Sequence, residues 1–424
     1  MASSSNTANH PLSGIRVVEF AGLAPGPFAG LILADWGADV IRIDRPPSSS
    51  SVTAEVPPDV LARDKRSIAV DPKVPSGLAV IKRLVSTADV LIEPFRPGVM
   101  ERLGLGPEVF LGGKDSSERG LNEKLVYARL VGFSRTGSHK DIAGHDLNYL
   151  ALSGVLSLLP GRPDQPSFPL NLLADFAGGG LMCAFGVLLA LYERSRSSRG
   201  QVVDTDMVSA TRYISSFALI NSFTASTTPS LPTQSVSGKD ASSRMQNLLD
   251  GGAPFYAIYT CTDGKCFSVA CLEPRFYKVF LEAFLAALPS EYKSEWVPTL
   301  VRQHRREEWS RLREFLERGF RLYDRAHWTK VFQGKDACAV PVLTPHEASI
   351  LMESDASPPP HPRLTRTPAK SLPAIPATAT AARYSLQPGA DTEVILNELG
   401  YSDKEQELLA RDGALGRLHC SAKL

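Results

Sequence analysis

The sequence predicts an α/β protein built on a parallel sheet, and its first half carries this prediction. Apolar runs recur there without strict alternation of apolar and polar residues, which is typical of strands buried on both faces. Residues 15–46 follow the order strand, glycine-rich turn, helix, strand, which is the repeating unit of a parallel sheet. With 424 residues, 43% of them hydrophobic, the chain is long enough for two or three domains.

The first domain is predicted element by element from these runs. Strands are expected at 15–20, 40–46, 67–71, 89–95 and 125–133, helices from 31, over 77–88 and over 181–196, and a further strand from 201. The longest apolar run, 181–192, is 12 residues long and contains a glycine. It is too short to span a bilayer, so we expect a buried helix and no membrane span.

The second half predicts a smaller α+β domain. A hairpin at 255–273 would turn at Asp263-Gly264, and helices continue to about residue 335. Residues 223–243 are rich in Ser, Thr, Pro and Gly, which indicates a linker or surface loop. We therefore expect a large domain over 11–222, a linker over 223–243, a small domain over 244–340, and a return to the large domain over 341–424 with a proline-rich segment and two C-terminal helices.

Composition and termini exclude several classes of protein. The 46 basic and 45 acidic side chains nearly cancel, which disfavours binding to nucleic acid. The six cysteines form no CxxC pair, so we expect no metal site and no disulfide framework. The N-terminus has the features of neither a secretory signal nor a transit peptide. Ala422-Lys423-Leu424 is similar to the S-K-L address, which predicts the peroxisome and its import receptor, with mitochondrion and cytoplasm as alternatives.

A glycine-rich loop follows the first strand. Gly22, Gly26 and Gly30 have the spacing G-x3-G-x3-G, whereas a dinucleotide fingerprint has G-x-G-x-x-G. Prolines at 25 and 27 also remove amide donors that a pyrophosphate would need. Basic residues near strand ends favour a phosphate-rich ligand nevertheless, against the alternative of a solvated basic surface. They are Arg42, Arg45, Arg63, Lys65, Arg66 and Arg96.

His145 and Asp146 lie directly before an apolar run that ends at Val155. An isolated histidine in such a place is more often a partly buried structural residue. Imidazole also changes charge near neutral pH, which suits proton transfer. The residue pattern alone leaves both interpretations open.

Ordered segments along the chain resemble the family III CoA-transferase superfamily, and within it the α-methylacyl-CoA racemases. Among them are "PLSGIRVVEFAGLAPGPFAG", "YARLVGFSRTG", "AGHDLNYLALSG", "PLNLLADFAGGG" and "LEPRFY", and the likeness is dense over residues 11–280. The resemblance implies a large Rossmann-like domain and a smaller one in an interlocked homodimer. It implies no metal and no cofactor, because the CoA is part of the acyl-CoA substrate.

The implied reaction inverts the α-carbon of a 2-methylacyl-CoA thioester and feeds the β-oxidation of branched fatty acids. By similarity, His145 and Asp175 are the two acid/base residues, and Glu273 of the small domain orients the histidine. The positions that match substrate or CoA contacts are Arg45, Ala69, Val70, Asp71, Pro72, Arg96, Gly144, Asp146, Leu147, Asn148 and Tyr149.

The implied chemistry agrees with these residue types. Inversion through an enolate requires two different acid/base groups on opposite faces of the carbon, one of them a carboxylate of raised pKa. We expect the backbone amides at the start of the "FAGGG" helix to stabilise the enolate oxygen. Taken alone, Asp175 is equally consistent with an N-cap.

Two alternatives remain at this point. A CoA transferase of the same family would use Asp175 as a nucleophile, but such enzymes typically lack the histidine found at 145. A catalytically silent CoA-binding scaffold is disfavoured by the three intact residues. Segments 112–120, 223–243 and 283–300 exceed the family pattern, and Asp391 replaces a family histidine, so the preferred acyl chain stays open.

Overall fold

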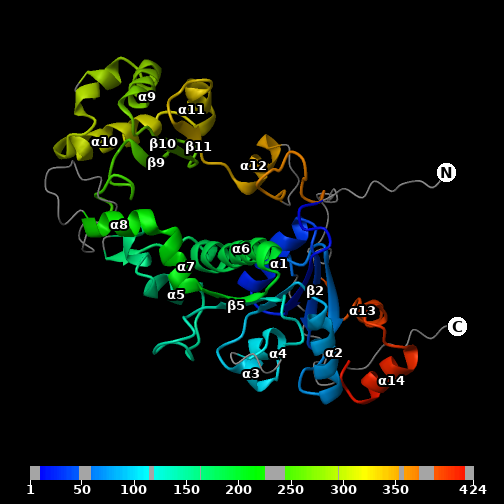
Figure 1. Cartoon of the computed structure of the whole chain (residues 1–424). Helices are drawn as coiled ribbons and strands as arrows, with labels where there is room; N and C mark the ends of the chain where they lie inside the picture. The colour runs from blue at the N-terminus through cyan, green and yellow to red at the C-terminus, as the bar shows by residue number, and fades with distance from the viewer. Residues whose placement is uncertain are drawn as a thin grey trace, which may run out of the picture. The chain divides into compact units, whose positions relative to one another are not determined.

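The computed structural model describes residues 10–46, 59–113, 119–162, 164–224, 244–294, 296–352, 358–371 and 386–415 (Figure 1). The chain divides into two compact units. The first comprises 1–153, 169–214 and 355–424, and the second 154–168 and 215–354. The chain thus enters the second unit twice, and it returns to the first at 355 rather than at 341. Most of the predicted linker, 225–243, lies outside the described residues.

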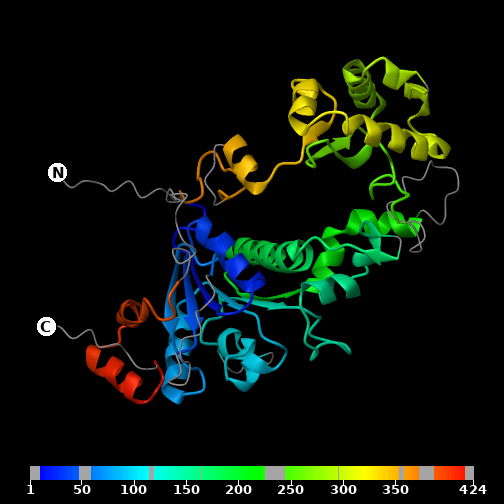
Figure 2. The same cartoon turned by 180° about the vertical axis from the view of Figure 1, so that it is seen from behind.

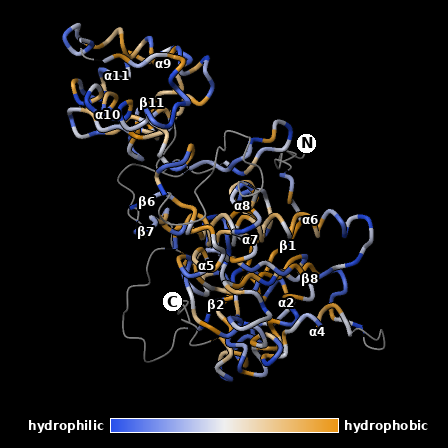
Figure 3. The backbone as a smooth tube through the Cα atoms, turned by 90° about the vertical axis from the view of Figure 1, so that its left-hand side faces the viewer, coloured by the Kyte–Doolittle hydropathy of each residue, from blue (hydrophilic) through white to orange (hydrophobic). Residues whose placement is uncertain are grey.

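The first unit contains a parallel sheet of six strands in the order β3-β2-β1-β4-β5-β8, which confirms the predicted fold class. The strands are β1 (Arg16–Phe20), β2 (Asp39–Asp44), β3 (Lys65–Ala69), β4 (Val90–Glu93), β5 (Val126–Val131) and β8 (Gln201–Asp206). The order reverses between β1 and β4, and ligands of such sheets bind beyond the carboxyl ends of the strands at that point. Figure 3 shows hydrophobic residues where β1 lies, and Val17 and Val18 of this strand are fully buried.

Helices cover the sheet of the first unit. They are α1 (Pro25–Asp35), α2 (Pro75–Ser86), α3 (Val99–Arg102), α4 (Pro107–Leu111), α5 (Asp146–Leu152), the π-helical segment η2 (Leu172–Leu181), α6 (Met182–Ser197), α7 (Met207–Ile214), α13 (Thr392–Glu398) and α14 (Asp403–Arg411). The first of them begins at Pro25, not at 31 as predicted. Proline is well tolerated in a first turn, because its missing N–H would have no partner there.

The segments η2 and α6 form one helix of 26 residues, Leu172–Ser197, so the prediction of a start at 181 was wrong. By length and composition this helix is apolar enough to cross a membrane. Its glycines nevertheless pack closely on α1: a Cβ on Gly179 would lie 2.9 Å from Pro25 Cβ, and one on Gly180 would lie 2.7 Å from Pro25 O. One face of the helix thus packs on α1, while large apolar residues elsewhere on it are exposed.

The C-terminal residues of the first unit cover the edge strand β3. The amide of Ser67 donates to Asp391 Oδ2 at 2.8 Å, and the amide of Ala69 donates to Thr392 Oγ1 at 3.2 Å. A capping box of Ser402 and Glu405 is present at the start of α14. Figures 1 and 2 show α13 and α14 beside this side of the sheet, so the chain's last described helices protect its edge.

The second unit has an antiparallel sheet in the order β11-β10-β9, surrounded by helices. Its elements are η1 (Leu156–Leu158), β6 (Gly161–Arg162), β7 (Gln165–Pro166), α8 (Ser216–Thr224), β9 (Tyr256–Thr260), β10 (Cys266–Ala270), α9 (Pro274–Ala287), η4 (Glu291–Lys293), η5 (Leu300–Arg302), η6 (Arg306–Glu308), α10 (Trp309–Phe320), α11 (Arg325–Phe332), β11 (Ala339–Pro341) and α12 (Pro345–Leu351). The hairpin turns at Asp263-Gly264 as predicted, with Gly264 at a φ of +75°. Stacked aromatic rings form the core, such as Phe284 on Trp328 at 4.9 Å.

Candidate active site

The predicted CoA-contacting positions lie where the parallel strands of the first unit end. Arg45 follows β2, residues 69–72 end and follow β3, and Arg96 follows β4. Arg45 and Arg96 are exposed, whereas the side chains of Ala69 and Val70 are buried in the core. At residues 69 and 70 only the backbone is therefore suited to contact a ligand.

Most of the basic cluster predicted for a phosphate-rich ligand is engaged within the protein. The pairs are Arg42–Asp44 at 2.8 Å, Arg63–Asp35 at 2.6 Å, Lys65–Glu19 at 2.7 Å and Arg66–Asp39 at 2.6 Å. These four side chains are held in ion pairs within the unit, so the expectation of a phosphate-rich ligand depends mainly on the other two. Of the six, Arg45 and Arg96 are the ones whose guanidinium groups have no described ion pair; Arg96 Nη1 donates to the carbonyl of Asp141 at 3.1 Å.

His145 lies at the start of α5, in the extended conformation of an N-cap residue, and its side chain is exposed. Its amide donates to Asn148 Oδ1 at 3.1 Å, and its carbonyl accepts from the amide of Asn148 at 2.8 Å. The preceding turn is held by Tyr149, whose hydroxyl donates to the carbonyl of Gly144. The local sequence thus fixes the backbone on both sides of His145.

Glycine is required beside the Tyr149 ring. A Cβ on Gly132 would lie 2.1 Å from Tyr149 Cζ, and one on Gly144 would lie 2.8 Å from Tyr149 Cε1. The edge of the same ring meets Phe133 at 4.9 Å between centroids. This packing places the turn before His145 against the end of β5.

Asp146 connects the start of α5 to the segment that carries Asp175. It is only 6% exposed, and its Oδ1 accepts from the amides of Ala174 at 2.9 Å and Asp175 at 2.7 Å. The residue next to His145 is thus bonded to the backbone of Asp175; that the two side chains act in one site stays a prediction. The side chain of Asp146 binds backbone through one oxygen, and the predicted substrate contact of residue 146 stays a prediction.

Asp175 is half-buried within the π-helical segment, an irregularity that is frequent at functional sites. The N-cap is Asn171, so the N-cap interpretation of Asp175 was wrong. The expected enolate-binding amides are also not at a helix start, because the helix begins at Leu172 and Asp146 occupies the amides of Ala174 and Asp175. Asn171 Nδ2 donates to Asp175 Oδ2 at 3.3 Å, a contact that the sequence analysis missed.

The electrostatic surroundings raise the pKa of Asp175. Burial is the main cause, the hydrogen bond from Asn171 opposes it, the charge of Asp146 adds to it, and His145 acts in the lowering direction. Burial likewise raises the pKa of Tyr149, with a further contribution from the charge of Asp175. A carboxyl group with a raised pKa can release and take up a proton closer to neutral pH.

Glu273 belongs to the second unit, where it is exposed and precedes α9 as its N-cap residue. Its carbonyl accepts from the amides of Phe276 and Tyr277, both at 3.0 Å, while its side chain makes no capping bond. The side chain is thus available for another partner. Its pairing with His145 stays a prediction.

Sequence reasoning also missed Glu93, the last residue of β4. Its side chain is fully buried, its Oε2 accepts from the amide of Phe95 at 2.8 Å, and Arg135 Nη1 lies 3.4 Å from its Oε1. Burial raises the pKa of Glu93 to about 7. In the sequence, Glu93 could have been noticed as a carboxylate at the end of a predicted strand, three residues before Arg96.

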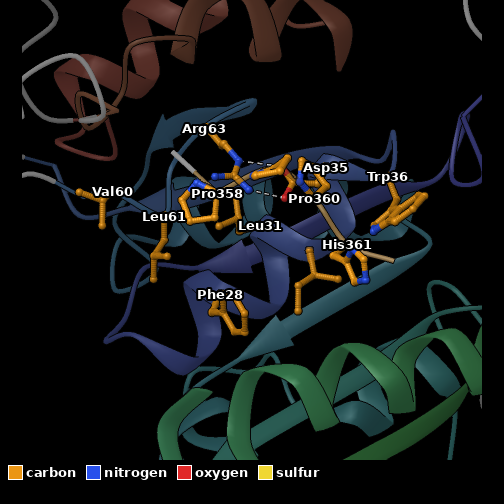
Figure 4. Close-up of a pocket in the computed structure, with 12 residues that line it drawn as sticks. Phe28, Leu31, Asp35, Trp36, Val60, Leu61, Arg63, Pro358, Pro360 and His361 are labelled. Carbon is orange, nitrogen blue, oxygen red and sulfur yellow. Dashed lines mark hydrogen bonds and ion pairs between the residues drawn. The ribbon is translucent and has the colours of Figure 1, made fainter. Parts of the chain in front are cut away.

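A hollow of about 640 Å³ lies along α1 in the first unit (Figure 4). It is mainly apolar, with Phe28, Leu31 and Trp36 among its lining residues and the Asp35–Arg63 pair in its wall. Of the residues predicted for ligand binding, Arg63 of the basic cluster lines it, whereas none of the predicted catalytic residues or CoA-contacting positions does. Within the described part of the chain, no group of three or more His, Cys, Asp or Glu side chains could hold a metal ion.

Known proteins are similar in sequence to this chain over most of its length. Alpha-methylacyl-CoA racemase from Homo sapiens is 43% identical over 408 residues, covering 93% of this chain and 94% of that protein. The racemase of the same name from Mus musculus is 43% identical over 406 residues, with the same shares covered. Succinyl-CoA--D-citramalate CoA-transferase from Chloroflexus aurantiacus is 34% identical over 277 residues, 63% of each chain.

A solved structure shows the same fold. A CAIB/BAIF family protein from Brucella suis matches with a TM-score of 0.68 at 23% identity, covering 92% of this chain and 100% of that one. The model of CoA-transferase family III matches residues 12–391. With most of its length matched by that model and by relatives of 43% identity, the chain belongs to CoA-transferase family III, as its sequence predicted.

Proposed function

We propose that this protein is an isomerase that inverts the α-carbon of 2-methylacyl-CoA thioesters. Two observations support the proposal: Asp146, the residue next to His145, accepts a hydrogen bond from the amide of Asp175 at 2.7 Å, and the charge of His145 acts on the carboxyl of Asp175. The names of the two relatives with 43% identity give the substrate class. The raised pKa of Asp175 suits a group that alternates between acid and base.

In the proposed reaction one of the two groups removes the α-proton from one face of the carbon. The electron pair of the broken C–H bond moves into the thioester, giving an enolate with its charge on oxygen. The other group then delivers its proton to the opposite face, and a new C–H bond forms with inverted configuration. Each group serves as base in one direction and as acid in the other.

The exposed guanidinium groups of Arg45 and Arg96 supply the charge that the CoA phosphates require. Both residues follow strands whose carboxyl ends meet at one edge of the sheet. Arginine binds phosphate through paired, charge-assisted hydrogen bonds. Because the CoA is part of the proposed substrate, the proposed reaction needs no separate cofactor.

CoA transfer is the second candidate function, because relatives of 34% identity carry transferase names and Asp175 can act as a nucleophile. One incubation separates the two. A single pure epimer of a 2-methylacyl-CoA is placed in D2O with the protein and without any free carboxylic acid. Isomerase activity gives epimerisation with deuterium at the α-carbon; a reaction that starts only when a second acid is added identifies a transferase.

A homodimer is also proposed, from an apolar stripe on the continuous helix that η2 and α6 form. Its members are exposed and recur at helical spacing: Leu181, Phe185, Leu188, Leu189 and Tyr192. Contiguous exposed apolar surface of this kind marks an interaction site in most soluble proteins. A second copy of the chain is the proposed partner, and Phe185→Glu is expected to give a monomer in sedimentation analysis. An unchanged sedimentation coefficient would contradict this assignment.

The peroxisome is the proposed location. Residues 422–424 lie outside the described residues, so this proposal depends on the sequence of the tripeptide alone. Inversion at the α-carbon serves β-oxidation of branched acyl-CoAs, and that pathway operates in peroxisomes and mitochondria. An import receptor at the C-terminus is the corresponding partner.

A further inference from the structure

Asp146 connects the segments that carry the two proposed acid/base residues. It follows His145 directly in the chain, and its Oδ1 accepts from the amide of Asp175 itself. The second bond, from the amide of Ala174 at 2.9 Å, fixes the direction of the carboxylate. One side chain therefore links the N-cap of α5 to the third and fourth residues of η2.

The other oxygen of Asp146 is distinctive. Oδ2 is buried and has no hydrogen-bond partner among the described residues. A buried carboxylate oxygen without a hydrogen-bond partner lowers the stability of the fold, so stability does not explain its presence. An uncharged residue with a single acceptor would satisfy both amides equally well, so capping alone does not explain a charge at this place.

We propose that Asp146 is a positioning residue that holds Asp175 at a fixed distance from His145 and acts on it through its negative charge. This inference deepens the proposed function and rests on it. The charged or titratable groups described as acting on Asp175 are His145 and Asp146, and Asp175 in turn acts on Tyr149. Asp146 is the one that both binds the backbone of Asp175 and raises its pKa.

Two variants separate position from charge. Asp146→Asn keeps an oxygen for both amides, and its NH2 group takes the place of Oδ2, where no bond is lost. Asp146→Ala removes the bonds and the charge together. The matched control is Asp206→Ala: Asp206 also holds a helix start, since its Oδ1 accepts from the amide of Ser209 at 2.8 Å, but it binds neither acid/base residue.

We expect Asp146→Ala to lower kcat on the order of a hundredfold, because small misplacements of a catalytic group have effects of that size. KM should change by less than about threefold, since CoA binding is left intact. Asp206→Ala is expected to keep kcat within about twofold. In Asp146→Asn, the pKa of Asp175 should fall because a neighbouring negative charge is removed. The acidic limb of the pH profile of kcat/KM should then move to lower pH, in the reaction direction that uses Asp175 as base.

Hydrogen exchange provides a readout that does not depend on activity. The amides of Ala174 and Asp175 should exchange faster in Asp146→Ala than in the wild type, and at the wild-type rate in Asp146→Asn. Near-wild-type kcat in Asp146→Ala, or an unmoved acidic limb in Asp146→Asn, overturns the inference. A wild type that exchanges slowly at these amides but does not invert the thioester contradicts the proposed function instead, so the two failures are distinguishable.

Discussion

Replacing Glu93 by glutamine is expected to abolish a pH-dependent loss of stability in the first unit. The carboxyl group is fully buried at the end of β4, and Arg135 and Arg129 lie 3.4 Å and 3.9 Å from its Oε1. Burial outweighs these charges and raises the pKa of Glu93 from its ordinary value of 4.5 to about 7. Glutamine imitates the protonated form, which the folded protein prefers.

The direction and the size of the change in the free energy of unfolding follow from proton linkage. Between pH 4.5 and 7 the folded protein binds the Glu93 proton more tightly than the unfolded chain does, so unfolding releases it. The stabilisation is complete below pH 4.5 and is lost as the pH rises through 7. At about 1.4 kcal/mol for each pH unit between the two pKa values, the loss is about 3 kcal/mol.

The assay compares the free energy of unfolding of the wild type and of Glu93→Gln between pH 4.5 and 8. Hydrogen exchange in urea of peptides that span β4 and β5 reports on the first unit alone. The wild type should lose about 3 kcal/mol relative to Glu93→Gln over this range. Glu108→Gln, which changes an exposed carboxylate of the same unit, should follow the wild type. If the free energies of unfolding of the wild type and of Glu93→Gln changed in parallel with pH, the reasoning would be refuted.

Three further predictions concern the site and the tail. Gly144→Ala should lower kcat, because the new Cβ would lie 2.8 Å from Tyr149 Cε1, whereas Gly113→Ala meets nothing within 4 Å and should not. Arg96→Ala should raise KM about tenfold or more with kcat nearly kept; a collapse of kcat at constant KM would contradict its role. Deleting Leu424 should leave activity intact and the protein in the cytosol by fluorescence microscopy, and import of the truncated protein alone would exclude the tail as the signal.

The strands of the first unit were predictable, because strands buried on both faces are apolar throughout, as Val17 and Val18 illustrate. Helix starts were harder. Pro25 was interpreted as part of a turn, although it begins the first helical turn of α1. The helix start at Leu172 was missed because the π-helical Leu172–Leu181 precedes the apolar run that indicated the helix. The short entry of 154–168 into the second unit depends on tertiary contacts and has no local signal.

The site divides in the same way. His145 and Asp175 were identified through resemblance, since each residue alone fitted a structural role as well. Asp146 was assigned to substrate contact by the same resemblance. Its bonds to Ala174 and Asp175 could not be foreseen, because they join segments that lie 28 and 29 residues apart. The engagement of Arg63 and Lys65 in ion pairs also required the folded arrangement. Long-range pairing of polar groups is what the sequence left undetermined.

The central claim is that His145 and Asp175 act on opposite faces of one carbon. The most direct measurement follows deuterium uptake and configuration together, in D2O, for His145→Ala and Asp175→Ala supplied with each pure 2-methylacyl-CoA epimer. Both variants should lose inversion by orders of magnitude, and each should still exchange the α-proton of one epimer, a different one in the two variants. Inversion at the wild-type rate in either variant, or exchange of both epimers by the same variant, would contradict the two-base account.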